Sequence, residues 1–184
     1  MKKLSEKSKE TFYHRHRSIL LLLAIVLLLL LFFKKIFVLA VLIALSFLVS
    51  FFQNTLVGRN IGLELVTLAA VISGIVYGSI TGFFIGFVLI VFHLMMSRHM
   101  GPYILWVIPG YSIVGVISGV FPTVNIITLG IVLTVVLNLA FILLTLLITP
   151  SALPKSLPHF ITNAVINVIL FSTIAQPIYS LIAK

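Results

Sequence analysis

An uncharged stretch of 25 residues, NIITLGIVLTVVLNLAFILLTLLIT at positions 125–149, is followed directly by Pro150. A transmembrane helix needs about 20 predominantly apolar residues, so this stretch is long enough to cross a bilayer. Residues 18–33, 36–52 and 160–183 are also free of charged residues. The pattern predicts an all-α integral membrane protein with several membrane-spanning helices.

The composition supports the same class of protein. Hydrophobic residues make up 61% of the 184 residues and charged residues 8%, whereas a soluble domain has about a quarter charged residues. So little charge cannot cover a water-facing surface, and the length leaves room only for short connections. We therefore expect a compact helical bundle of six to seven transmembrane helices. Cysteine is absent, which excludes disulfides and cysteine-based metal sites.

Three parts follow one another along the chain. We expect a basic N-terminal tail over 1–17, an additional leading hydrophobic helix over 18–35 and a six-helix membrane core over 36–184. Residues 62–97 have no polar break, although a single helix of that length would run about 54 Å. The chain must therefore reverse, and Tyr77-Gly78-Ser79 is the expected place. The core helices are predicted at 36–52, 62–77, 79–97, 102–121, 125–149 and 157–182.

The charge distribution favours a lipid bilayer over a nucleic acid as the partner. The formal net charge is +9, and six of the twelve basic residues lie in the first 17 positions. Because basic residues favour the cytoplasmic side, we expect a multi-pass protein of the plasma membrane with a cytoplasmic N-terminus. Seven spans would place Arg59, Arg98 and Lys155 on that side as well. A six-span core would place these three residues outside, and the count of basic residues favours seven spans.

Small residues recur at every fourth position in the core. Residues four apart share a helix face, and small side chains let helix backbones approach closely in lipid. The spacing predicts either tight packing of helices 62–77, 79–97 and 102–121 or the wall of a close-fitting cavity. A further pair, Ala40 and Ala44, lies on the first core helix. The glycines of this pattern are Gly74, Gly78, Gly82, Gly86, Gly115 and Gly119.

Polar residues inside the apolar helices are functional candidates, because polar groups are costly to bury in a bilayer. Glu64 is the single acid outside the tail. It could cap its helix, pair with Arg59, or bind a proton or a cationic ligand group in a cavity. His159, Asn163 and Asn167 share one face of the last helix. They either bond to neighbouring helices or line a polar cavity.

Aromatic residues and a further amide could join such a cavity. The candidates are Asn138, Gln176, Tyr77, Tyr103, Trp106 and Tyr111. Trp and Tyr suit the membrane interface equally well. Amides and aromatic rings together suit a neutral or weakly charged ligand that carries a ring and hydrogen-bonding groups. The sequence thus predicts a small-molecule solute as one possible ligand without identifying it.

The chain carries none of the sequence motifs of soluble enzymes that we considered. It has no P-loop, no HExxH motif and no paired carboxylates. Ser112 and His159 lie on different helices, as the serine and histidine of a rhomboid-type intramembrane protease do, but the residues around both depart from that pattern. We therefore expect no enzymatic activity, no cofactor and no metal.

Three sequence features resemble those of two families of membrane proteins. They are GIVYGSITGFFIGF at 74–87, PGYSIVGVISGVF at 109–121, and LPHFITN at 157–163, where the last helix opens. The core resembles the substrate-binding (S) components of energy-coupling factor (ECF) transporters. It also resembles MreD, a rod-shape membrane protein with a similar compact core. The leading helix and the basic tail have no counterpart in this pattern.

The first resemblance implies a membrane-embedded solute-binding component of an ATP-driven importer. Its partners would be an energising transmembrane subunit, docked at Ala40 and Ala44, and ATPase subunits. The solute would bind on the non-cytoplasmic side. The second resemblance implies a scaffold or assembly protein of the cell envelope with no substrate, whose polar stripe is structural or binds a partner helix. The ligand-binding residues expected for the importer are His159, Asn163, Asn167, Glu64, Trp106 and Tyr111.

Overall fold

The computed structural model describes residues 33–53, 61–97 and 101–183, together with Leu21, Ile25, Val26 and Leu28. The chain divides into two units, 1–37 and 38–184, and the division falls close to the predicted start of the six-helix core. The basic tail, most of the leading helix, Arg59, Arg98 and Lys184 lie outside the described residues.

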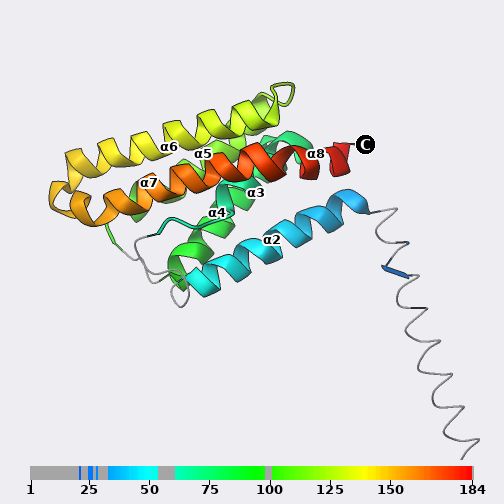
Figure 1. The fold of residues 1–184 in the computed structure, drawn as a ribbon, viewed down its shortest axis with the longest axis horizontal. Helices are drawn as coiled ribbons and strands as arrows, with labels where there is room; N and C mark the ends of the chain where they lie inside the picture. The colour runs from blue at the N-terminus through cyan, green and yellow to red at the C-terminus, as the bar shows by residue number, and fades with distance from the viewer. Residues whose placement is uncertain are drawn as a thin grey trace, which may run out of the picture. The chain divides into compact units, whose positions relative to one another are not determined.

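All regular secondary structure in the described part of the second unit is helical, which confirms the prediction of an all-α bundle for this part (Figure 1). A 3₁₀ turn at Pro150–Ala152 precedes α7, and a π-helical turn at Phe171–Ala175 joins α7 to α8 in one long helical segment. The helices are α2 (Lys34–Phe52), α3 (Val66–Tyr77), α4 (Ser79–Met96), α5 (Ile104–Val120), α6 (Ile126–Ile148), α7 (Leu153–Leu170) and α8 (Gln176–Ala183).

Four of the described helical segments are long and apolar enough to cross a membrane: α2, α4, α6 and the segment 150–182. Helices α3 and α5 are apolar but shorter. Large apolar side chains also cover outward-facing positions, such as Val136, Leu143 and Leu147 on α6. These features are consistent with a membrane-embedded protein, while the number of spans stays a prediction.

Helix α3 forms the centre of the second unit. Every residue from Val66 to Gly74 is buried, so protein encloses the first nine residues of this short helix on all sides. The sequence predicts a helix from residue 62, but the structure begins α3 at Val66 and leaves 61–65 extended. At this start the side chain of Glu64 takes part in capping the helix, because it accepts the backbone N–H of Thr67 at 3.0 Å.

The chain reverses between α3 and α4 at Gly78, as predicted from the sequence. This residue has φ of +90°, and no heavy atom lies within 4 Å of the position a Cβ would take. Glycine is favoured here because other residues adopt such a backbone conformation only at a cost. Gly78 therefore forms a one-residue turn and does not belong to the packing face on which the sequence pattern placed it.

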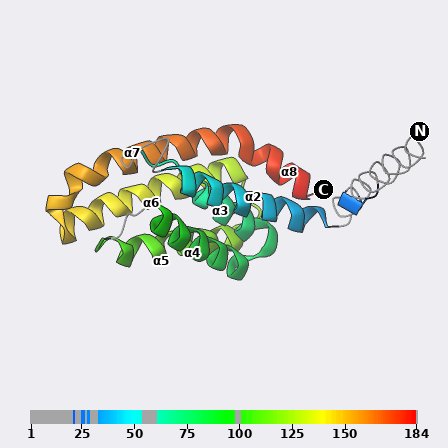
Figure 2. The ribbon, with the colours of Figure 1, turned by 90° about the horizontal axis from the view of Figure 1, so that it is seen from below.

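The other glycines of the pattern lie where helices meet. A Cβ at Gly82 or Gly115 would collide with the backbone of the other residue, so α4 and α5 touch through their main chains. Gly74 also faces the carbonyl of Gly115, Gly86 faces the carbonyl of Tyr111, and Gly119 faces the backbone of Ser79. Small residues thus join α3, α4 and α5 into one tightly packed layer, and Figure 2 shows α4 and α5 side by side.

Candidate functional site

The extended segment 61–65 brings Glu64 into the interior, where its side chain is 1% exposed. Carboxylate atom Oε1 accepts hydrogen bonds from the hydroxyl of Thr67 at 2.6 Å and from the amides of Asn167 at 2.8 Å and Asn163 at 3.2 Å. Atom Oε2 accepts the backbone N–H of Thr67. Both oxygens are therefore occupied by donors from α3 and α7.

The polar stripe of α7 also binds the backbone of the extended segment. Asn163 donates its second amide hydrogen to the carbonyl of Gly62 at 3.1 Å, and the hydroxyl of Thr162 accepts the N–H of Gly62 at 2.8 Å. From α2, Gln53 donates to the carbonyl of Ile61 at 2.8 Å. Gly62 itself is required for close approach, because a Cβ would collide with the carbonyl of His159 and with Asn163.

These bonds explain why a non-helical segment can exist inside an apolar bundle. Backbone groups that leave a helix must find other partners, and in a bilayer such a segment is tolerated only where protein surrounds it. Thr162 and Asn163 of α7, together with Gln53, supply those partners. We refer to Glu64, Thr67, Asn163 and Asn167 below as the Glu64 network.

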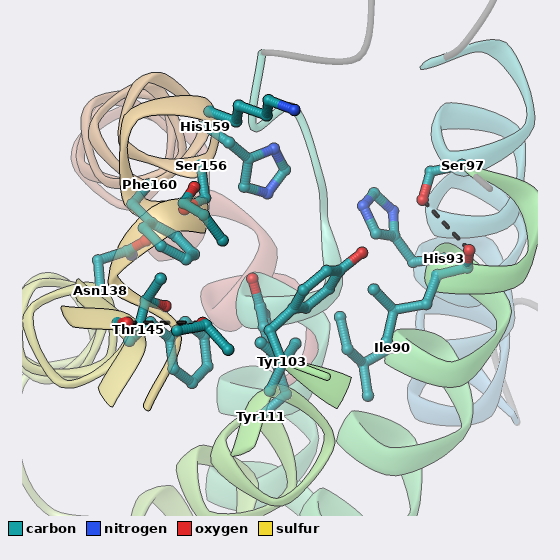
Figure 3. A pocket seen from close by; sticks show the side chains of 16 residues that line it. Ile90, His93, Ser97, Tyr103, Tyr111, Asn138, Thr145, Ser156, His159 and Phe160 are labelled. Atoms are coloured by element: carbon teal, nitrogen blue, oxygen red, sulfur yellow. Dashed lines mark hydrogen bonds between the residues drawn. The ribbon is translucent and has the colours of Figure 1, made fainter. Parts of the chain in front are cut away.

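A cavity of about 370 Å³ lies at the end of the second unit where α4 ends, α5 begins, α6 ends and α7 begins (Figure 3). Its volume lies within the range of about 300–1,000 Å³ that is typical of small-molecule sites. Aromatic rings and polar side chains from all four helices line it. The lining residues include Ile90, His93 and Ser97 near the end of α4, Tyr103 and Tyr111 at α5, Asn138, Phe141, Thr145 and Thr149 at α6, and Lys155, Ser156, His159 and Phe160 at α7.

Two lining residues of α6 offer polar atoms to the cavity. The hydroxyl of Thr145 is buried and has no hydrogen-bond partner in the protein. Asn138 donates both amide hydrogens, to the carbonyl of Thr134 at 2.9 Å and to Oδ1 of Asn163 at 3.0 Å. Its own Oδ1 is therefore the atom left for a ligand, and its amide links the cavity to the Glu64 network.

Tyr103 and Tyr111 contribute phenol groups to the same cavity. Tyr111 is 4% exposed, and its phenol interacts with Thr67, Asn163 and Glu64. Burial raises the pKa of Tyr103, which precedes α5, to about 12, so its hydroxyl keeps its proton at neutral pH. Tyr103 is thus a hydrogen-bond donor under physiological conditions.

His93 connects the cavity to α2. Its Nδ1 lies 2.9 Å from the hydroxyl of Ser50, and that hydroxyl donates its hydrogen to the carbonyl of Ser46 at 2.7 Å. The hydroxyl of Ser50 thus joins the imidazole of His93 to the backbone of α2.

The structure divides the residues that the sequence suggested for ligand binding. His159 and Tyr111 line the cavity, whereas Glu64, Asn163 and Asn167 form the adjacent network and are not lining residues. Trp106 is buried but also outside the lining. Ala40 and Ala44 are both exposed on α2.

Sequence reasoning missed several residues of the cavity. Phe141 and Thr145 follow Asn138 at helical spacing, so a search for the face shared with Asn138 would have found them. Lys155 precedes His159 by four residues in the same way. Across the described residues, no group of three His, Cys, Asp or Glu side chains is placed to hold a metal ion.

Comparisons of the chain with protein-family models, curated proteins and solved structures find no match in any of the three.

Proposed function

We propose that this chain is a polytopic membrane protein that binds a small solute in the cavity between α4, α5, α6 and α7. The supporting observation is a cavity of about 370 Å³ that is lined by aromatic rings and by Asn138, whose side-chain oxygen receives no hydrogen bond from the protein. A hydrogen-bond donor on a bound solute would satisfy this oxygen. Aromatic rings beside this group are typical of small-molecule sites.

The resemblance to ECF transporter S components makes an ATP-driven importer the leading setting for this binding. In that setting, an energising transmembrane subunit would dock on α2, with ATPase subunits attached to it. The exposure of Ala40 and Ala44 on one side of α2 is compatible with such docking. The chain itself would bind the solute and perform no chemistry.

Native mass spectrometry of the protein, purified gently from its own membranes, tests the proposal. We expect a bound small molecule together with ATPase subunits. Thr145→Phe fills the cavity and should remove the small molecule, whereas Thr128→Phe, at an exposed position on α6, should keep it. Loss of the molecule from both variants, or from neither, would contradict binding in this cavity.

A scaffold or assembly role of the MreD kind is the second candidate, and one observation favours it. Asn163 and Asn167 are packed against Glu64 and the backbone of Gly62, as a purely structural stripe would be. For this role the same mass spectrometry should find a ligand-free protein with cell-envelope assembly partners. That result would replace the importer proposal.

A further inference from the structure

Positive and hydrogen-bond-donating groups surround the cavity, and no carboxylate is found among its described lining residues. Lys155 lies on the exposed part of the lining, with His159 one helical turn further along α7. Both residues therefore lie where the cavity meets its surroundings.

The nearest acid in the described chain does not oppose this charge at the lining. Glu64 lies behind the lining, and both of its oxygens already accept hydrogen bonds from Thr67, Asn163 and Asn167. The remaining acids of the sequence, Glu6 and Glu10, lie in the tail outside the described residues. The exposed end of the cavity is therefore suited to a negatively charged group.

The middle of the cavity is suited to a flat ring. Phe141 lies between two other aromatic side chains, with its ring centroid 5.8 Å from that of Tyr111 and 6.0 Å from that of Phe160. All three residues line the cavity and come from different helices. Aromatic pairs at such separations attract one another, and a ligand ring can extend the same arrangement.

The inner end of the cavity is suited to a neutral hydrogen-bonding group. Asn138 lies seven residues before Thr145 on α6, which places it about 10 Å further along the helix axis. It is 4% exposed and presents Oδ1, an acceptor, because both of its amide hydrogens are bound elsewhere.

We infer that the solute is a small organic anion built on a flat ring, with its anionic group at Lys155 and His159 and a hydrogen-bond donor at Asn138. This inference rests on the proposed solute binding and specifies its chemical class. The charge attraction fixes the orientation of the ligand, because a reversed ligand would place its anion against the acceptor oxygen of Asn138. A cation with the same ring has no partner at the lysine end.

Three probes with one ring and three charges test the inference on the full purified chain. Benzoate, benzamide and benzylamine carry charges of about −1, 0 and +1 at neutral pH. Their binding is measured from the shift of the thermal unfolding midpoint as each probe is titrated. We expect benzoate to bind about tenfold more tightly than benzamide, and benzylamine to bind most weakly.

Lys155→Met provides the decisive variant, and Lys34→Met removes the same charge from a residue outside the lining. Lys155→Met should bring the affinities of benzoate and benzamide together, whereas Lys34→Met should keep the tenfold difference. Lys155 is exposed, so the substitution should leave folding intact. Retention of the preference for benzoate in Lys155→Met would overturn the assigned orientation.

The outcomes separate this inference from the proposed function. Equal binding of all three probes, or preference for benzylamine, would overturn the anion assignment and leave solute binding standing. If no probe binds and the protein from its own membranes carries no small molecule, both proposals are overturned. If no probe binds but a neutral or cationic molecule is found, the anion assignment alone fails. An anionic molecule that is lost from Lys155→Met would support it.

Discussion

Asn163 shows how a single side chain can hold a non-helical segment inside the bundle. Its two amide hydrogens bond to the carbonyl of Gly62 and to Glu64, and its oxygen accepts a hydrogen from Asn138. The residue is 1% exposed, so water cannot replace it as the hydrogen-bond partner of Gly62, Glu64 and Asn138. Asn163 therefore stabilises the fold through hydrogen bonds to three separate residues.

We predict that Asn163→Leu lowers the free energy of unfolding by about 2 kcal/mol, because it leaves buried donors and acceptors without partners. Thermal unfolding in detergent measures the change as a lower midpoint. Val165→Leu, at an exposed position on the same helix, is the control and should unfold as the original chain does. An unchanged midpoint for Asn163→Leu would contradict a structural role for the Glu64 network.

At the scale of helices, α3, α4 and α5 depend on contact between their backbones. The glycines at these contacts leave no room for a side chain, whereas Gly78 has room but an unusual backbone conformation. Replacing glycine by alanine therefore destabilises the protein for a different reason at each kind of position. At the helix contacts the new methyl group displaces a whole helix, whereas at Gly78 the backbone strain stays local.

We predict that Gly115→Ala destabilises the chain more than Gly78→Ala does. The new methyl group at residue 115 must push α4 away, but at residue 78 the cost is about 1–3 kcal/mol of backbone strain. Unfolding midpoints of the two variants, measured under the same detergent conditions, provide the comparison. A larger decrease in the unfolding midpoint for Gly78→Ala would show that α4 and α5 can move apart at little cost in free energy.

Helix α2 gives a second prediction at this scale. Ala40→Leu and Ala44→Leu enlarge exposed side chains, so neither should change the unfolding midpoint. If a partner subunit docks on these small residues, both variants should lose that subunit on co-purification. Val41→Leu, also at an exposed position of α2, should retain it. Intact complexes in both alanine variants would contradict docking at this pair.

The predictions from sequence agree best with the structure for features that depend on residues close together in the chain. The uncharged run 125–149 and the turn at Gly78 could be predicted because length and local backbone freedom determine them. The extended segment before α3 could not, since its hydrogen-bond partners lie about 100 residues away, on α7. For the same reason, the division of the α7 stripe between cavity and network required the folded structure.

At the scale of the whole molecule, the proposed import function requires a particular orientation. The cavity end contains the connection between α6 and α7, whereas α5 and α6 are joined at the opposite end. Seven spans with a cytoplasmic N-terminus would place the cavity on the cytoplasmic side. A solute taken up from outside needs the cavity on the other side, which requires a leading helix that does not cross the membrane.

The absence of cysteine from the sequence makes this orientation measurable. Ser151→Cys lies at the cavity end, and Thr123→Cys lies in the connection at the opposite end; both residues are exposed. For an importer, we predict that a membrane-impermeant maleimide labels Ser151→Cys in intact cells and labels Thr123→Cys only after lysis. The reverse pattern would exclude uptake through this face and favour seven spans.

The distance along the chain between Glu64 and its partners has a consequence for biosynthesis. Asn163 and Asn167 are made 99 and 103 residues after Glu64, which corresponds to a delay of roughly 5–20 s at ordinary rates of translation. Throughout this interval, in the proposed bilayer location, the carboxylate has no amide donors and α3 is too short to cross alone. The segment 61–77 must therefore wait at the insertion machinery or the membrane surface until α7 emerges, so a ribosome that stops before Asn163 should leave it accessible to protease.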